Sequence, residues 1–414
     1  MNRTLHDYEQ VVGSQAISQL HQLARDLKGA RVVHVNSTRV GGGVAEILAW
    51  LNPLMNELGL NTDWDVIEGN PKFFNTTKAF HNGLQGNPVI LTDSMIKAYE
   101  DTVAENAERL RPMLEEADFV FIHDPQPAAL LELCPNRRGK WIWRCHIDAS
   151  RPNRRIWNYL RSKVAGYDAS IFSMPDFAQR LPHPQFIIAP SIDPLSEKNQ
   201  ELSVKEVRET MRSFGINLSD KPPILTQVSR FDRFKDPIGV IKAFNLLNGV
   251  FDAHLILAGG GATDDPEGEI VLREVQEAAN GNERIHILNL PADAHRTINA
   301  LQRASTIVFQ KSLQEGFGLT VTEAMWKGKP VIGGHVGGIR LQVHNHHTGF
   351  LVDTPEGAAL RTRELLRRPE KIRAMGTTAK RFVIENFLLN RHLREYLTLM
   401  LGLRRGLANH LIAD

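Results

Sequence analysis

The sequence predicts an α/β protein built from two doubly wound domains of similar size, with a cleft between them. Short apolar runs rich in β-branched residues alternate with longer stretches of helical periodicity, which is typical of a parallel sheet covered by helices. This alternation occurs twice, and a polar stretch at residues 191–202 separates the two series. Polar and glycine residues follow many of the apolar runs. Ligands of open α/β sheets bind at that edge, so the pattern also indicates where a site should lie.

The first series begins with a strand, a glycine loop and a helix. We expect the strand at residues 31–37, a flexible turn at Gly41–Gly43 and the helix at residues 44–58. Residues 1–30 carry an amphipathic helical pattern without recognisable chemistry. Further strands of this domain are expected at residues 63–67, 119–122, 141–145, 169–172 and 186–189.

The second series repeats the pattern after the polar stretch. Its expected strands are residues 224–229, 254–258, 285–288, 307–309 and 331–332. Its expected helices are residues 237–247, 267–279, 294–302, 319–327 and 357–366, followed by helical stretches at 370–385 and 388–401. We therefore expect a first domain at residues 1–190, with a last helix at about 388–414 packing back on it, and a second domain at residues 191–387.

The composition is that of a globular protein with little net charge. Of 414 residues, 42% are hydrophobic and 23% charged, and the net charge is +2 at pH 7. A balance so near zero does not favour nucleic acid or an anionic membrane surface as a partner. The first residues lack the apolar core of a signal peptide, and no apolar run has the length of a membrane span. We expect a soluble, cytoplasmic protein in which Cys134 and Cys145 are free thiols.

The stretch from Gln310 to Ile332 carries the strongest functional pattern. It reads as strand, glycine turn, helix and strand, with Glu315 before the turn and Glu323 about one turn into the helix. Unpaired N–H groups at such a helix N-terminus suit a phosphate. The residues alone leave three interpretations of the two glutamates: an acid/base pair, acceptors for sugar hydroxyls, or solvated surface charges. The glycine turn favours ligand binding.

Two cations, Arg230 and Lys235, follow the expected strand at residues 224–229. They are close enough in sequence to converge on one anion. A diphosphate leaving group accumulates negative charge as its bond breaks, and fixed cations stabilise that charge. The alternative is a solvated pair on a surface loop.

His146 directly follows the strand at residues 141–145 and precedes Asp148. A lone histidine is often a packing residue, but a position at the carboxyl end of a strand favours a functional role. His344, His346 and His347 lie in a loop without the carboxylates that a metal site would add, and we predict no metal there.

The glycine loop of the first domain does not carry a dinucleotide fingerprint. Gly41–Gly43 lacks the third glycine, and Glu68 is only a loose substitute for the ribose-binding acid of that motif, so an NAD-dependent oxidoreductase is weakly supported. The glycines do fit a loop whose backbone must approach a phosphate or sugar closely.

Together these features resemble the retaining glycosyltransferases of family 4, which have the two-domain GT-B fold. Glu315, Gly316, Phe317 and Gly318 with Glu323 look like the E-x7-E signature of that family, and the resemblance extends over roughly residues 30–400. The stretches VNSTRVGGGVAEIL, HDPQPAAL, WRCHIDAS and QVSRFDRFKDP are most similar to the trehalose glycosyltransferring synthases within it. Retaining trehalose phosphorylases share much of this pattern, so phosphate and nucleotide both remain open as the leaving group.

The resemblance implies roles for individual residues. Four would be catalytic: Arg230 and Lys235 holding the donor diphosphate, Glu315 holding the C3 and C4 hydroxyls of the transferred glucose, and His146 near its C6 hydroxyl and anomeric carbon. Glu323 would bind the ribose. The other implied donor-binding residues are Gly42, Gly43, Gly259, Gly260, Phe317, Gly318, Leu319 and Thr320. The implied acceptor-binding residues are Asn82, Gln85, Asp124, Gln126 and Asp148.

The implied reaction is a reversible front-face transfer that retains the configuration of the sugar. The first domain would bind the acceptor and the second the donor. The expected partners are nucleotide diphosphate glucose, glucose and trehalose, without nucleic acid, membrane or cofactor and with no metal required; a homodimer stays open. A transferase with another acceptor and a nucleotide-sugar-binding protein without turnover are the further alternatives.

Overall fold

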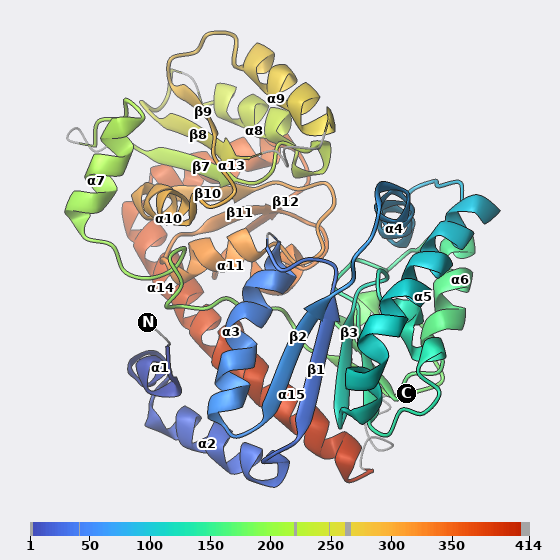
Figure 1. The fold of residues 1–414 in the computed structure, drawn as a ribbon. Helices are drawn as coiled ribbons and strands as arrows, with labels where there is room; N and C mark the ends of the chain where they lie inside the picture. The colour runs from blue at the N-terminus through green and yellow to red at the C-terminus, as the bar shows by residue number, and fades with distance from the viewer. Residues whose placement is uncertain (1–2, 41, 219–221, 248, 261–265, 407–414) are drawn as a thin grey trace. The chain divides into compact units, whose positions relative to one another are not determined.

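The computed structural model describes residues 3–40, 42–218, 222–247, 249–260 and 266–406 (Figure 1). The chain divides into two compact units: Met1–Ser191 with Leu389–Asp414, and Ile192–Leu388. Each unit contains a six-stranded sheet in which every strand pairs in parallel with its neighbours. The predicted α/β class, with two doubly wound sheets, is confirmed.

The first unit has the strand order β2-β1-β3-β4-β5-β6. Its strands are β1 (Arg31–Asn36), β2 (Asn61–Val66), β3 (Phe119–His123), β4 (Lys140–Arg144), β5 (Ala169–Phe172) and β6 (Gln185–Ile187). Its α-helices are α1 (Leu5–Val12), α2 (Ser14–Ala24), α3 (Gly43–Glu57), α4 (Pro71–Leu84), α5 (Asp93–Glu116), α6 (Arg154–Val164) and α15 (Leu389–Arg404).

Helices cover both faces of this first sheet because its inner strands are buried on both sides. Strands β3 and β5 are buried at every position. Helix α15 packs against α2 and α3, whereas α4, α5 and α6 pack among themselves and with the 3-10 helix Ala128–Leu133 (Figure 1). Both cysteines are buried free thiols, as the sequence predicts.

The second unit has the strand order β12-β11-β10-β7-β8-β9. Its strands are β7 (Ile224–Val228), β8 (His254–Gly259), β9 (Ile285–Asn289), β10 (Ile307–Gln310), β11 (Val331–Gly334) and β12 (Gly349–Val352). Its α-helices are α7 (Val204–Ser213), α8 (Pro237–Asn245), α9 (Pro266–Ala279), α10 (His295–Ala304), α11 (Leu319–Trp326), α12 (Ile339–Gln342), α13 (Pro355–Leu366) and α14 (Pro369–Asn386).

Two separate apolar cores flank this second sheet. Leu255 and Leu257 of β8 belong to the core shared with α8 and α13, whereas Ile256 and Ala258 belong to the core shared with α7 and α10. Alternate side chains of one strand thus enter opposite layers, as the pleat requires. Helix α7 and strand β12 were not among the predicted elements.

Both sheets reverse their order of growth at one internal strand pair. In the first unit the chain adds β2 beside β1 and then returns to place β3 on the other side of β1. In the second unit it adds β8 and β9 beside β7 and then places β10 on the other side. Crevices outside the carboxyl ends of strands at such a reversal are the usual ligand sites of open α/β sheets.

Among the described residues, none of the helices combines the length and apolar character needed to cross a membrane.

Candidate functional site

The reversal point of the second unit brings two predicted loops together. Strands β7 and β10 are hydrogen-bonded neighbours, with Leu225 in register with Ile307. The loop that ends at Lys235 follows β7, and the loop that contains Glu315 follows β10. Residues 80 positions apart in sequence therefore meet at one edge of the sheet.

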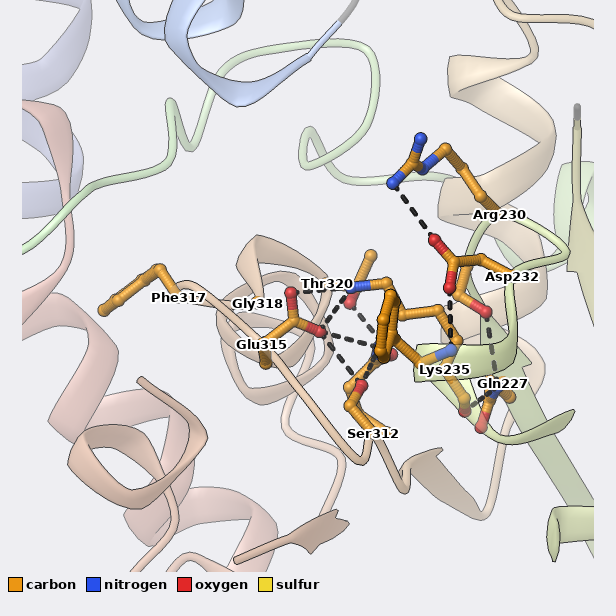
Figure 2. A network of polar contacts seen from close by, with 12 residues as sticks. Gln227, Arg230, Asp232, Lys235, Ser312, Glu315, Phe317, Gly318 and Thr320 are labelled. Carbon is orange, nitrogen blue, oxygen red and sulfur yellow. Dashed lines mark hydrogen bonds and ion pairs between the residues drawn. The ribbon is translucent and has the colours of Figure 1, made fainter. Parts of the chain in front are cut away.

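A network of polar contacts centres on the Glu315 carboxylate (Figure 2). Lys235 Nζ lies 2.7 Å from Oε1 and 2.8 Å from Oε2. Oε2 also accepts hydrogen bonds from Ser312 Oγ at 3.0 Å and from Gln310 Nε2 at 3.3 Å. Oε2 is thus fully used inside the protein, whereas Oε1 receives Lys235 and retains a lone pair for a ligand hydroxyl.

The loop from Glu315 to Gly318 is held by a buried glutamine of α12. Gln342 Nε2 donates to the Phe317 carbonyl at 2.7 Å and to the Gly338 carbonyl at 3.2 Å, and its Oε1 accepts from Thr322 Oγ1 at 2.6 Å. The Phe317 side chain is buried and packs on Phe387. Only the backbone of Phe317 is therefore available to a ligand.

Helix α11 begins directly after this loop. Gly318 precedes it with φ of 81°, a left-handed conformation that favours glycine. Leu319 and Thr320 form the first turn, whose N–H groups cannot bond within the helix and carry the positive end of its dipole. Thr320 Oγ1 donates to Gln310 Oε1 at 3.0 Å, which ties the helix start to β10. The arrangement offers an anion several N–H donors beside the Lys235 cation.

Arg230 lies at the border of this network. Its side chain is exposed and turned toward Asp232, with Nη2 3.3 Å from Oδ2 (Figure 2). Asp232 in turn caps the 3-10 helix Arg233–Lys235 by accepting from Phe234 N. The two predicted cations therefore differ: Lys235 is fixed by a carboxylate and half-buried, whereas Arg230 has room to move toward an anion.

Close packing requires glycine at positions 259 and 260, in addition to any role in ligand binding. A Cβ on Gly259 would lie 1.8 Å from the Ser229 carbonyl oxygen, and one on Gly260 would lie 2.3 Å from the Leu290 carbonyl oxygen. The ends of β7, β8 and β9 approach too closely there for a larger residue.

Glu323 lies on α11 and is buried. Lys327, one turn later, donates to the Glu323 carbonyl at 3.1 Å and to Asn199 Oδ1 at 3.0 Å. Burial lowers the pKa of the Lys327 ammonium, and the negative charge of Glu323 opposes that shift.

The reversal point of the first unit contains a cavity of about 160 Å³. Its lining residues come from the ends of β1 and β3 and the start of α3: Asn36, Ser37, Thr38, Gly42, Gly43, Val44, Ala45, His123 and Asp124. Gly42, at φ of 80°, precedes the 15-residue helix α3, while Gly41 lies outside the described residues.

Asp124 and His146 are directly connected beside this cavity. The His146 backbone N–H donates to Asp124 Oδ1 at 2.7 Å. Asp124 has φ of 64°, and burial raises the pKa of its carboxyl to about 7, although the His146 N–H and the Arg144 cation oppose that shift. The His146 ring continues inward, with Nε2 3.0 Å from His123 Nδ1.

Comparison with known proteins assigns the chain to a family. The family model described as "Trehalose synthase, N-terminal domain" matches residues 34–179, and "Glycosyl transferases group 1" matches residues 209–382. A trehalose synthase from Thermococcus litoralis is 45% identical over 403 residues, covering 96% of this chain and 97% of that protein. The chain belongs to the trehalose synthase family of glycosyltransferases.

Two more distant similarities are informative. A trehalose phosphorylase from Pleurotus pulmonarius is 26% identical over 407 residues, covering 86% of this chain but only 55% of that protein. The solved structure of a UDP-forming α,α-trehalose-phosphate synthase from Burkholderia xenovorans has a TM-score of 0.73 at 14% identity, covering 91% of this chain and 99% of that one. This structural likeness confirms the predicted GT-B fold.

The other predicted acceptor residues do not line the cavity. Of the five, only Asp124 does. Asp148 Oδ1 accepts from the Ser150 N–H at 2.9 Å, Gln85 directly follows the end of helix α4, and Asn82 lies within α4. Gln126 Oε1 is buried and has no hydrogen-bond partner in the described part of the chain. Their roles in this trehalose synthase relative stay predictions.

For several residues of both sites no role was predicted from the sequence. Gln227 donates to the Lys235 carbonyl at 3.0 Å, Gln310 and Ser312 contact Glu315, and His123 contacts His146. All four lie at or just past the carboxyl end of a strand. A position at the end of a strand can be predicted from the sequence. Which strand ends lie next to each other depends on the strand order and register, which local sequence patterns do not give.

No metal site accompanies these groups in the ranges that the structure describes, where no three His, Cys, Asp or Glu side chains gather around a common point. His344 and His346 pack on the rings of Phe382 and Phe350 instead.

Proposed function

We propose that this protein transfers glucose from a nucleotide diphosphate glucose to free glucose, with retention of configuration, and so forms trehalose and a nucleoside diphosphate. The observation that carries the proposal is the similarity to trehalose synthase along 96% of the chain. The site of the second unit supports it, because a cation, a helix N-terminus and a hydroxyl-accepting carboxylate adjoin there.

The donor would bind to the second unit. Lys235 and the N–H groups at the start of α11 would hold the diphosphate, and the exposed Arg230 would turn from Asp232 to join them. Oε1 of Glu315 would accept a hydroxyl of the transferred glucose while Oε2 stays bound to Ser312 and Gln310. Glu323 would accept from the ribose. Neither glutamate needs to transfer a proton in this scheme.

The acceptor glucose would bind to the first unit, with Asp124 in the cavity as one ligand. The bond between the anomeric carbon and the phosphate oxygen breaks, and a new bond forms from that carbon to the anomeric oxygen of the acceptor. The acceptor hydroxyl gives its proton to the departing phosphate oxygen. Transition-state stabilisation is then electrostatic: Lys235, Arg230 and the helix end receive the negative charge of the diphosphate.

A donor screen tests the proposal. The protein is incubated with glucose and ADP-, UDP- or GDP-glucose, and the product is identified by NMR. We expect an α,α-1,1-linked disaccharide with at least one donor, and at least 100-fold less with Lys235→Met, the order lost when one charge-stabilising group is removed. Absence of this disaccharide with all three donors would overturn the proposal.

A retaining trehalose phosphorylase is the second candidate, favoured by the similarity to the Pleurotus protein. It would release glucose 1-phosphate from trehalose and inorganic phosphate without a nucleotide. The two activities separate in one experiment: trehalose is incubated with phosphate alone or with a nucleoside diphosphate alone. We expect nucleotide diphosphate glucose in the second mixture and no glucose 1-phosphate in the first.

A further inference from the structure

Three histidines form a hydrogen-bonded row that leads from the interior of the first unit to His146. His34 Nδ1 lies 3.1 Å from His123 Nε2, and His123 Nδ1 lies 3.0 Å from His146 Nε2. The three residues come from β1, the last position of β3 and the second position after β4; β1 neighbours β3, and β3 neighbours β4. The row therefore forms because these strands are neighbours in the sheet. The spacing of the three histidines along the sequence does not predict it.

The interior end of the row is enclosed by aromatic rings. His34 is fully buried and stacks on Phe121 at 4.8 Å and on Tyr396 of α15 at 6.2 Å. Nε2 of His34 is buried and has no hydrogen-bond partner among the described residues. At the other end, His146 is half-buried, and within the described chain Nδ1 of its ring is in no hydrogen bond.

All three rings are neutral. Burial lowers the pKa of His34 to about 3 and lowers the pKa of His123 and His146 well below the ordinary value. The fully buried Arg144 cation, which is in register with His123, adds to the lowering for His123 and His146. His392 of α15 also faces this group, and burial lowers its pKa too.

Neutral rings allow only two arrangements of protons along the row. Each ring carries one N–H, and each contact needs one donor and one acceptor. Either every ring donates toward His146, which leaves an N–H on His146 Nδ1, or every ring donates toward His34. Any mixed order would give His123 two protons or none, and a second proton there is a cation beside Arg144.

The interior end decides between the two arrangements. Donation toward His34 would leave a buried N–H at His34 Nε2 without an acceptor. Buried N–H groups without an acceptor are rarer in proteins than buried acceptors without a donor. Donation toward His146 leaves only a lone pair there.

We propose that His34 and His123 are positioning residues that hold His146 with its proton on Nδ1, so that His146 donates a hydrogen bond to a hydroxyl oxygen of the bound sugar and cannot remove a proton from it. This inference rests on the proposed glucosyl transfer. It assigns the row a function that requires no change of charge during the reaction.

The first test measures the tautomer directly and does not depend on turnover. Long-range proton–nitrogen NMR of the full chain labelled with ¹⁵N-histidine distinguishes Nδ1–H from Nε2–H, and the His146→Gln variant identifies the His146 signals. We expect Nδ1–H on His146 in the wild-type protein and a mixture of tautomers in His123→Leu. A wild-type His146 with its proton on Nε2 would overturn the proposal, whatever the donor screen shows.

The second test measures the kinetic consequence. We expect His123→Leu to lower kcat about 10- to 100-fold, as is typical when the group that orients a functional histidine is removed, with KM changed less than about threefold. His123→Gln can still donate an amide N–H to His146 Nε2 and should recover most of the loss. His34→Phe keeps the stacking and should reduce kcat only a few-fold, because it removes a hydrogen bond one ring further away.

A matched control exists in the second unit. His254 Nδ1 lies 2.9 Å from His286 Nε2, and both residues lie near the amino ends of their strands, away from the ligand edge. His286→Phe breaks this imidazole pair and should leave kcat unchanged. Wild-type kcat in His123→Leu, in a protein that makes trehalose, would refute the positioning role even if the tautomer is as expected.

Discussion

Lys235 and Glu315 form a bidentate ion pair at the reversal point of the second sheet, with Nζ 2.7 Å and 2.8 Å from the two carboxylate oxygens. Their side chains are only 16% and 10% exposed. The pair joins the loop after β7 to the loop after β10, so it sets the shape of the site before any ligand binds. The carboxylate that we propose to bind a sugar hydroxyl is thereby also the group that fixes the nearby cation.

Glu315→Gln should therefore lower the free energy of unfolding. The variant keeps the shape of the side chain but leaves Lys235 without its counter-charge in a half-buried place. We expect a loss of about 1–3 kcal/mol, between the values typical of exposed and of fully buried pairs. Urea denaturation measures it. The exposed Lys97–Asp101 pair, 2.9 Å apart, is the control: Asp101→Asn should change stability by less than about 0.5 kcal/mol.

The double variant Lys235→Met/Glu315→Gln isolates the interaction itself. Its loss should be smaller than the sum of the two single losses by at least about 1 kcal/mol, because either single change already breaks the pair. Strictly additive losses would show that the two side chains do not stabilise one another.

Gly337→Ala should disrupt the loop that carries Glu315. Gly337 has φ of 45°, and an added Cβ would lie 1.7 Å from the Glu315 carbonyl oxygen, so the backbone of one loop would have to move. Gly215→Ala is the matched control, since Gly215 has φ of 76° but a Cβ there would meet no described atom within 4 Å. We expect about 1–2 kcal/mol of backbone strain for the control and a clearly larger loss, with weaker donor binding, for Gly337→Ala.

Equal losses for the two glycine variants would show that left-handed strain alone explains both. Donor binding by calorimetry with a nucleotide diphosphate glucose separates the outcomes further, because Gly215 lies just after α7, outside the loops that follow β7 and β10.

The fold and much of the second site follow from the sequence, whereas the pairing of side chains does not. Apolar strand runs alternating with helices suffice to predict two parallel sheets. The glycine turn before α11 indicates Glu315, and the position just after the expected strand at residues 224–229 indicates Arg230 and Lys235. That Lys235 pairs with Glu315 depends on β7 and β10 being neighbours, whereas Arg230 turns to Asp232 within its own loop. Strand order is a long-range property that local patterns do not contain.

The elements and residues that were missed have related causes. Strand β12 spans only Gly349–Val352 and begins with glycine, which weakens a strand pattern. Helix α7 directly follows the polar stretch that was interpreted as a connection. His34 lies in the middle of an apolar strand, and its contact with His123 requires the parallel register of β1 and β3, in which His34 is opposite Phe121.

Gln342 should be required for the conformation of the loop from Glu315 to Gly318, although it lies outside any predicted motif. It is fully buried, and its amide bonds the carbonyls of Phe317 and Gly338 and the hydroxyl of Thr322. Gln342→Met has a similar volume but removes the hydrogen bonds to the Phe317 carbonyl and the Thr322 hydroxyl, at about 1–3 kcal/mol for each group left unsatisfied. We expect a lower unfolding midpoint in urea and a higher KM for the donor.

Gln342→Glu separates hydrogen bonding from packing. A carboxylate fills the same space but offers no donor to the Phe317 carbonyl, so this variant should lose donor affinity as well. Donor affinity at the wild-type level in Gln342→Glu would mean that the amide does not hold the loop.

Asp124→Asn should become more stable relative to the wild-type protein as the pH rises. Burial raises the pKa of the folded-state carboxyl to about 7, against 3.8 for the ordinary group. Below pH 4 the carboxyl is protonated in both the folded and the unfolded chain. Between pH 4 and pH 7 only the unfolded chain ionises, so the wild-type protein progressively loses stability, and above pH 7 the loss stays constant.

Asparagine does not ionise, so the variant lacks this dependence of stability on pH. Its amide oxygen can still accept the His146 N–H, and asparagine tolerates the left-handed φ of 64°. The stability difference should therefore increase by at most about 4 kcal/mol across that window, at about 1.4 kcal/mol per pKa unit. Urea denaturation of both proteins at pH 4.5, 6 and 8 measures it. A difference that is the same at all three pH values would show that Asp124 is ionised in the folded protein throughout, with its negative charge stabilised by Arg144.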